Sequence, residues 1–196
     1  MATEGGEQPP IFNIVGDSVA LGPVRRDLVP LYQRWLNDFE VIRTLGVPIR
    51  PMTYEGEEAW YDGAARGGSY SASFTIYERA THRPIGNTGL HEIDHQHRTA
   101  TFGILIGEKD CWGKGYGTET ARLMLDYGFT ALGLHNIMLK VFSVNERGIR
   151  AYLRAGFREI GRRRVSHRIA GVVYDDVYMD CLATEFESPV LRKLLA

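Results

Sequence analysis

The chain has 196 residues, a length that fits one domain with a substantial core. Hydrophobic residues make up 44% and charged residues 24%, which separates the sequence from disordered, fibrous and membrane-embedded classes. Lys and Arg total 23 against 24 for Asp and Glu, so a formal charge of −1 gives no global reason to expect a polyanionic partner.

The cysteines and the chain ends give expectations about location. Cys111 and Cys181 lie far apart without a Cys-x-x-Cys spacing, so free thiols in a reducing compartment are expected rather than disulfides or zinc. Residues 1–10 lack the apolar core of a secretory signal, and residues 1–17 are expected to form a flexible tail. No run approaches the roughly 18 consecutive apolar residues that span a bilayer. We therefore expect a cytoplasmic protein whose partners include neither membrane nor nucleic acid.

Hydrophobic spacing in the first third of the chain predicts a strand, a helix, a loop and a second helix. Pro23 closes a short apolar run, and Leu28, Leu31 and Trp35 then recur at helical spacing. Pro48 lies in a stretch that reads as a loop. The predicted elements are a strand over residues 18–22, a helix over 25–37, a loop over 45–53 and a helix over 54–66.

The middle of the chain predicts three successive antiparallel strands. Phe74 and Ile76 share one face of the first strand, and polar turns separate the strands from one another. Gly103, inside the third strand, marks a bulge or a close approach of backbone. The predicted strands cover residues 71–78, 85–93 and 99–106.

Helical spacing returns at Gly115. Asn145 is a typical helix cap, and Gly156 ends the helix that follows it. Residues 183–196 are expected to form a C-terminal tail or a short helix. The other predicted elements are a helix over residues 115–132, a strand over 137–142, a helix over 145–156, and strands over 157–168 and 172–181.

A glycine-rich turn, Trp112–Thr118, stands between a predicted strand and a predicted helix. Its amides and the positive end of the helix dipole can hold a phosphate, although a plain connecting loop is the competing interpretation. A Rossmann site would need its glycines in the first βα unit, whereas three antiparallel strands precede this turn. A Walker A loop would need Ser or Thr directly after Gly-Lys, whereas Lys114 is followed by Gly115.

This turn, its helix and residues 145–157 together resemble the GCN5-related N-acetyltransferase (GNAT) superfamily. Gly115 and Gly117 match the family's Q/R-x-x-G-x-G/A loop, and Trp112 stands at the Q/R position. That substitution is common in the branch that resembles ribosomal-protein alanine acetyltransferases and spermidine acetyltransferases. Residues 85–106 also resemble the spermidine branch.

The resemblance implies a GNAT fold of the α/β (α+β) class over residues 18–182. Such a fold has a mixed, mostly antiparallel sheet of about seven strands flanked by about four helices. The sheet is splayed between its fourth and fifth strands, here the predicted strands 99–106 and 137–142.

The resemblance also implies acetyl-CoA as a co-substrate. The pantetheine arm would lie between the two splayed strands, and the diphosphate would meet the glycine-rich turn. The residues that this assigns to the cofactor are Ile104, Leu105, Ile106, Trp112, Gly113, Lys114, Gly115, Tyr116, Gly117, Thr118 and Asn145.

By the same resemblance Tyr152 is the general acid, a role in which a positioned phenol protonates the departing thiolate. Its competing interpretation is a buried aromatic on a short helix. Many relatives carry a basic Glu where this chain has Thr101, so Glu92 is the best substitute and Asp94 the next. Each carboxylate taken alone also fits an ordinary solvated turn. The predicted catalytic residues are Tyr152, Glu92 and Asn145.

His91, His95 and His97 alternate as metal ligands on a strand could. An intervening turn and the lack of a fourth ligand argue against zinc, and no metal is expected.

The acceptor is less defined by the sequence than the cofactor. Glu55, Glu57, Glu58 and Asp62 make one helix acidic, as a cationic acceptor would favour, although such a run is usually a solvated face. The acceptor is left open between a polyamine, a protein N-terminal amine, an aminoglycoside and a small amine metabolite. A non-catalytic acyl-CoA-binding regulatory module is the alternative function. A homodimer is the usual default assembly.

Overall fold

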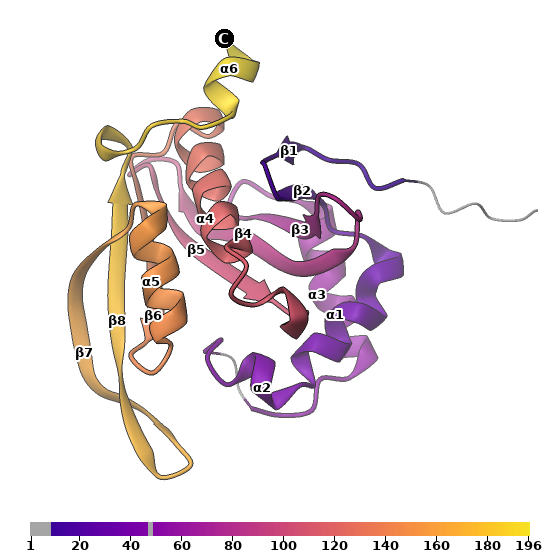
Figure 1. The fold of residues 1–196 in the computed structure, drawn as a ribbon, viewed down its shortest axis with the longest axis vertical. Coiled ribbons are helices and arrows are strands. Elements are labelled where there is room, and N and C mark those ends of the chain that lie inside the picture. Colours follow the sequence, from indigo (N-terminus) through magenta and orange to yellow (C-terminus); the bar gives the residue numbers. More distant parts are fainter. Residues whose placement is uncertain (1–8, 47–48) are drawn as a thin grey trace, which may run out of the picture.

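The computed structural model describes residues 9–46 and 49–196. Within them one sheet of eight strands runs in the order β1-β2-β3-β4-β5-β6-β8-β7 (Figure 1). All seven predicted strands are present, and β1 is an addition at the edge. The strands are β1 Ile14–Val15, β2 Val19–Pro23, β3 Ala72–Glu78, β4 Pro84–Asp94, β5 Thr99–Ile106, β6 Asn136–Phe142, β7 Arg158–Ile169 and β8 Val172–Leu182.

The sheet opens between β5 and β6. These strands run parallel and pair over only three residues, Thr99–Thr101 with Asn136–Met138. Beyond that point β5 stays paired with β4 and β6 stays paired with β8, so the two strands diverge. Beyond the paired residues, β5 and β6 each have a backbone edge that is not paired with the other strand. The N–H and C=O groups of such an edge are available to hydrogen-bond a ligand. The predicted splay between the fourth and fifth strands is confirmed.

Six α-helices flank the sheet in the described residues. The predicted helix 25–37 consists of a 3-10 turn, Arg26–Leu28, followed by α1, and after it the Asp38 side chain accepts the Glu40 N–H and caps a separate α2. A π-helical turn, Tyr127–Ala131, continues α4 through most of the predicted helix 115–132. The helices are α1 Val29–Leu36, α2 Phe39–Ile42, α3 Tyr54–Arg66, α4 Tyr116–Asp126, α5 Glu146–Ala155 and α6 Leu191–Leu195.

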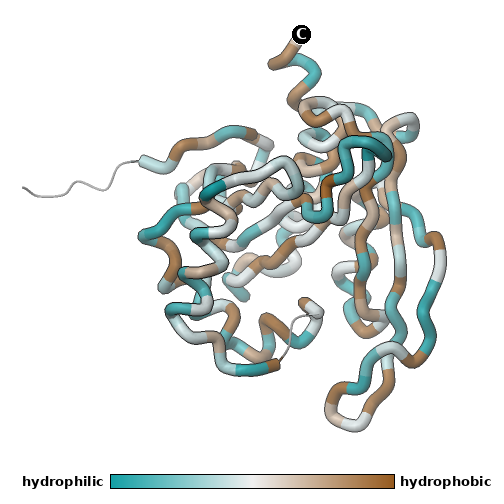
Figure 2. The backbone as a smooth tube through the Cα atoms, turned by 180° about the vertical axis from the view of Figure 1, so that it is seen from behind, coloured by the Kyte–Doolittle hydropathy of each residue, from teal (hydrophilic) through white to brown (hydrophobic). Residues whose placement is uncertain are grey.

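Two hydrophobic clusters hold these elements together. The larger combines the inner faces of the strands with α4, whose Leu123 and Met124 are fully buried. The smaller lies under α1 around Tyr32 and Trp35. In Figure 2 hydrophobic segments accordingly recur along the central strands. The Tyr32 hydroxyl also hydrogen-bonds Thr75 Oγ1 at 2.5 Å, which fastens α1 to β3.

At both ends the folded domain extends beyond the boundaries predicted from the sequence. Of the predicted tail 1–17, residues 1–8 lie outside the described residues, while Ile14 is buried in β1 and pairs with Leu21. At the other end Asp126 accepts the backbone N–H groups of Val190 and Leu191, at 2.9 and 2.8 Å, which fixes the start of α6. Across the described part of the chain, no helix has the length and apolar character to cross a bilayer.

Candidate cofactor and acceptor site

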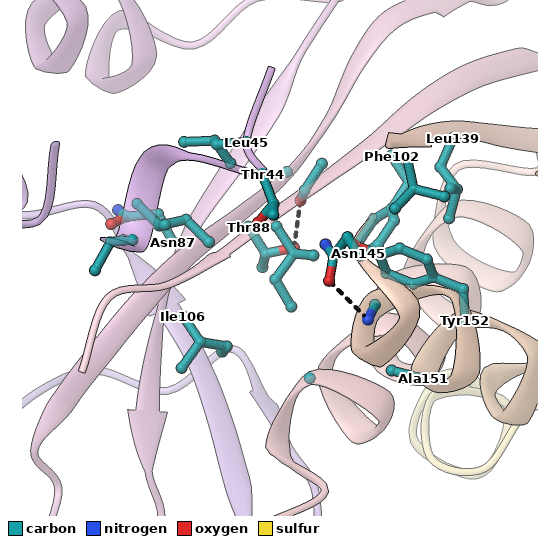
Figure 3. A pocket seen from close by; sticks show the side chains of 18 of the residues that line it. Thr44, Leu45, Asn87, Thr88, Phe102, Ile106, Leu139, Asn145, Ala151 and Tyr152 are labelled. Atoms are coloured by element: carbon teal, nitrogen blue, oxygen red, sulfur yellow. Dashed lines mark hydrogen bonds between the residues drawn. The ribbon is translucent and has the colours of Figure 1, made fainter. Parts of the chain in front are cut away.

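A cavity of about 890 Å³ occupies the opening between β5 and β6 (Figure 3). In this view Leu45 and Asn87 stand on one side of the cavity, and Asn145 and Tyr152 stand on the other. We call the side formed by residues 112–118 and α5 the α5 wall. We call the opposite side the α3 wall, and its lining residues are Leu36, Val41, Thr44, Leu45, Met52, Glu57, Trp60 and Asn87.

The glycine-rich turn shapes one end of the α5 wall. Gly113 and Gly115 have φ values of +78° and +89°, which glycine adopts at low cost, and Gly115 begins α4 without a side-chain cap. A Cβ added at Gly117 would meet no protein atom within 4 Å. The first amides of α4 therefore face open space at the positive end of a helix dipole, an arrangement suited to an anion.

Trp112 links the turn to both diverging parts of the structure. Its indole N–H donates to the Ile106 carbonyl at the end of β5, at 2.8 Å. The Arg147 guanidinium of α5 lies over its ring, 4.1 Å from the centroid.

Basic side chains line the cavity near this link, and sequence reasoning missed them. Their spacing on α5, three and four residues, puts three arginines on one face of the helix, a signal present in the sequence. Together they provide counter-charges for phosphate groups. The four are Lys140, Arg147, Arg150 and Arg154.

Nearly all residues predicted to bind the cofactor meet at this cavity. Lys114 is the exception: it is outside the described lining, and its ammonium lies 6.0 Å from the Tyr116 ring centroid. The Tyr116 hydroxyl itself donates to Glu78 at 2.7 Å. The predicted residues that do line the cavity are Ile104, Leu105, Ile106, Trp112, Gly113, Gly115, Tyr116, Gly117, Thr118 and Asn145.

Asn145 lines the cavity and also caps α5. Its Oδ1 accepts the Gly148 backbone N–H at 2.9 Å, which satisfies one of the free amides at the start of the helix. The side chain is thereby held in one orientation at the mouth of the splay. A structural role for Asn145 is therefore present whatever it contributes to a ligand.

Tyr152 lies about two turns further along α5 and points into the same cavity (Figure 3). Its ring packs edge-on against Phe102 and Phe157, with centroid distances of 6.1 Å in both pairs. Within the described residues its hydroxyl has no hydrogen-bond partner. Burial raises the pKa of Tyr152 to about 12, with the charge of Arg147 acting in the opposite direction. The phenol therefore stays protonated at neutral pH and can donate its proton.

The predicted base Glu92 lies beside the cavity rather than on its lining. It occupies a β-bulge with φ +51°, a strained value for a residue other than glycine, and its carboxylate accepts the Thr101 hydroxyl at 2.8 Å. Thr101 does line the cavity. Glu92 is thus connected to the site through one hydrogen bond.

His91 lines the cavity, where sequence reasoning considered it only as a metal ligand. Gly89 and Gly103 pair across β4 and β5, and a Cβ at either would come within 3.2 to 3.4 Å of the imidazole. Two glycines therefore make room for this ring. Burial lowers the pKa of His91, while the charge of Glu92 works against that shift. The sequence signal for His91 at the cavity was strand alternation, which puts Asn87, Gly89 and His91 on the same face.

The three histidines do not converge on one point. His95 Nε2 lies 2.7 Å from the Ser69 carbonyl oxygen, and His97 Nδ1 lies 2.9 Å from Asp94 Oδ2. The described residues contain no group of three side chains arranged to hold a metal ion.

The acidic helix α3 divides into an outer and an inner part. Glu58 and Asp62 pair with Arg26 on the outside. Glu57 is only 2% exposed, lines the cavity, and has an Oε2 without a hydrogen-bond partner in the described residues. Burial raises its pKa from 4.5 to about 7. Its spacing of three residues from Trp60, on the same helix face, was the signal in the sequence.

The family model described as an acetyltransferase (GNAT) domain matches residues 19–158 of the chain. The chain belongs to the GNAT acetyltransferase family. The match spans the splayed strands, the glycine-rich turn and α5, so it covers both the α5 wall and the α3 wall.

Relatives differ in how much of their length they share with this chain. The spermidine N(1)-acetyltransferase of Escherichia coli K12 is 44% identical over 72 residues, which are 37% of this chain and 38% of that enzyme. The human alpha/beta-tubulin-N-acetyltransferase 9 is 28% identical over 172 residues, 80% of each chain. The chain spans 38 to 58% of the length of the curated bacterial relatives that it matches.

A solved structure with the same fold contains a ligand. The spermidine N-acetyltransferase of Vibrio cholerae, in complex with CoA and spermine, superposes with a TM-score of 0.79 at 25% sequence identity. The superposition covers 87% of this chain and 98% of that one. The predicted GNAT resemblance is confirmed by the family match and by this structure.

Proposed function

We propose that this chain is an N-acetyltransferase that transfers an acetyl group from acetyl-CoA to a primary amine by direct attack. The observation that carries the proposal is the composition of one cavity. It combines the uncapped glycine-rich start of α4 with a protonated, unpartnered Tyr152 where the sheet splays. The family match and the CoA complex of the V. cholerae relative support the same co-substrate.

In this proposal the α5 wall holds the cofactor. The first amides of α4 and the arginines of α5 receive its phosphates. The free edge of β5, residues 102–106, offers backbone donors and acceptors to the amides of the pantetheine arm. Asn145, fixed by its capping bond, lies beside that edge. The thioester is thereby delivered next to Tyr152.

The proton movements then balance within the cavity. The acceptor ammonium loses a proton, its neutral nitrogen attacks the thioester carbonyl, and the C–S bond breaks as the thiolate leaves. Tyr152 donates its proton to that thiolate, and the second proton that the nitrogen loses on becoming an amide restores the phenol. We assign the first proton, lost from the ammonium before attack, to the imidazole of His91, with Glu92 beside it as the path to solvent.

The acceptor is an amine, and the relatives support two kinds. The E. coli and V. cholerae relatives are named for spermidine, which favours a polyamine. The human relative is named for tubulin, which favours a protein amine. The protein amine that we consider as an acceptor is a protein N-terminus.

A thiol-release assay tests the proposal. Wild-type protein with acetyl-CoA is offered spermidine, short diamines, alkyl monoamines and an alanine-terminated peptide, and free CoA is measured. Release that depends on one of these amines is the expected result. Tight binding of acetyl-CoA without release in the presence of any of them would instead favour a non-catalytic acyl-CoA-binding module.

A further inference from the structure

The α3 wall contains one acidic side chain that faces the cavity. Glu57 is the only acidic residue in the described lining, and the helix places it there because Trp60, three residues on, packs against Tyr32 of α1 on the same face. Its neighbours on α3 are used elsewhere, since Glu58 and Asp62 pair with Arg26 outside the cavity. A buried carboxylate with no partner is costly, and a bound cation would relieve that cost.

The surroundings of Glu57 fit a hydrocarbon chain. The Trp60 ring packs edge-to-face against Tyr32, with the ring centroids 5.8 Å apart. The rest of this wall is mainly aliphatic. Such a surface binds methylene groups through apolar burial. The aliphatic members of the wall are Leu36, Val41, Leu45 and Met52.

Glu57 and the reacting atoms belong to different sides of the cavity. Tyr152 lies on α5, and Glu57 lies on α3, on the other side of the opening in the sheet (Figure 1). An acceptor that reaches Tyr152 and also neutralises Glu57 must have two cationic ends joined by a chain.

We propose that the acceptor is a linear diamine whose reacting amine lies beside Tyr152 and whose second ammonium binds Glu57. This inference rests on the proposed acetyltransferase function and deepens it. One buried carboxylate matches one additional positive charge. A third amino group, as in spermidine, has no second acidic partner in the described lining, where the other fully charged side chains are Lys140, Arg147, Arg150 and Arg154.

The test compares diamines with monoamines of equal chain length. Steady-state kcat/KM is measured for a series of α,ω-diamines of increasing length and for the matching alkyl monoamines. Wild type is expected to prefer the best diamine over its matched monoamine by at least about tenfold, a ratio that corresponds to one modest charge contact. Spermidine is expected to be no better than that diamine.

Two variants test whether Glu57 causes the preference for diamines over monoamines. In Glu57→Gln the ratio of kcat/KM for the diamine to kcat/KM for the monoamine is expected to fall to about one, with CoA affinity measured alongside it. Glu55→Gln, an exposed acid two residues earlier on the same helix, is expected to keep the preference. The monoamine rate also reports whether each variant is folded.

Three results would overturn the inference while leaving the acetyltransferase function intact. They are equal use of monoamines and diamines by wild type, a diamine preference that survives in Glu57→Gln, and a marked preference for spermidine over every diamine. Failure of the function itself looks different, because wild type would then release CoA with none of the amines.

Discussion

The α5 wall and the α3 wall enclose the same cavity but are built by different means. The α5 wall is assembled from two contiguous segments, the turn 112–118 and the helix α5, and its charged lining residues are basic. The α3 wall draws on α1, α2, α3, β4 and residues 44, 45 and 52, is mainly apolar, and has one acid, Glu57. A wall for a shared cofactor can be encoded in local motifs, whereas a wall for a particular acceptor depends on which side chains the tertiary structure buries.

The strongest test of the α5 wall is Tyr152→Phe. Loss of the phenolic proton is expected to lower kcat about 100-fold, the lower range for general acid catalysis, while the affinity for acetyl-CoA stays nearly unchanged. Tyr127→Phe, a half-buried tyrosine outside the cavity lining, is the matched control and should be silent. Parallel losses of turnover and cofactor affinity would assign Tyr152 a packing role.

The raised pKa of Tyr152 predicts how turnover depends on pH. With the pKa of Tyr152 raised to about 12, the acid form persists across the usual assay range. Turnover should therefore show no loss on the alkaline side from this group below about pH 11. A decline of kcat near pH 10 that disappears in Tyr152→Phe would contradict this placement.

For the α3 wall, the largest expected effect is on stability. The folded-state pKa of Glu57 lies above its ordinary value of 4.5, so its contribution favours folding below that value and is lost as pH rises through about 7. Glu57→Gln should therefore gain stability relative to wild type between pH 5 and pH 8, on the order of 2 kcal/mol. Urea unfolding at several pH values measures this, with Glu55→Gln as control, and a pH-independent difference would argue against a buried carboxyl.

A smaller effect is expected from Gly117→Val at the turn. A Cβ at this position meets no protein atom within 4 Å, so folding is expected to be preserved while the branched group enters the space assigned to phosphate. CoA affinity measured by calorimetry should fall about tenfold, which is about 1.4 kcal/mol. Gly63→Val is the matched control, because Gly63 is another helical glycine with open space and lies outside the lining. Equal affinity in both variants would remove the phosphate assignment.

The smallest effect separates the two candidates for the base. Glu92→Gln is expected to change kcat/KM by less than about threefold, since its carboxylate reaches the cavity only through Thr101. His91→Gln should cost about tenfold or more and should remove an acidic limb that lies below pH 6.5, because burial lowers the pKa of His91. The reverse ranking would restore Glu92 as the direct proton acceptor.

The sequence predicted the α5 wall well because its signals are local. The glycines of the turn, the Asn145 cap and the position of Tyr152 lie within short segments whose backbone geometry follows from residue type. The α3 wall was predicted only as an acidic helix. Which of Glu55, Glu57, Glu58 and Asp62 would be buried depends on the packing of α3 against α1.

The bulge at Glu92 explains a second limit of sequence reasoning. Alternation alone puts His91, His95 and His97 on one face of a strand, but the register shifts between His91 and Asp94, and β4 ends at Asp94, so His95 and His97 lie in the turn that follows. The bulge and the turn together send the imidazoles to different neighbours. Periodicity cannot locate such a shift, since it depends on pairing with β5.

The position of the tryptophans gives each wall its own optical reporter. The indole of Trp112 lies under Arg147 on the α5 wall, and that of Trp60 lies beside Glu57 on the α3 wall. Trp35 is 2% exposed beneath α1 and is outside the cavity lining. Intrinsic fluorescence of single-tryptophan variants can therefore record how a ligand changes the surroundings of each indole, without a label and before any acetyl group has moved.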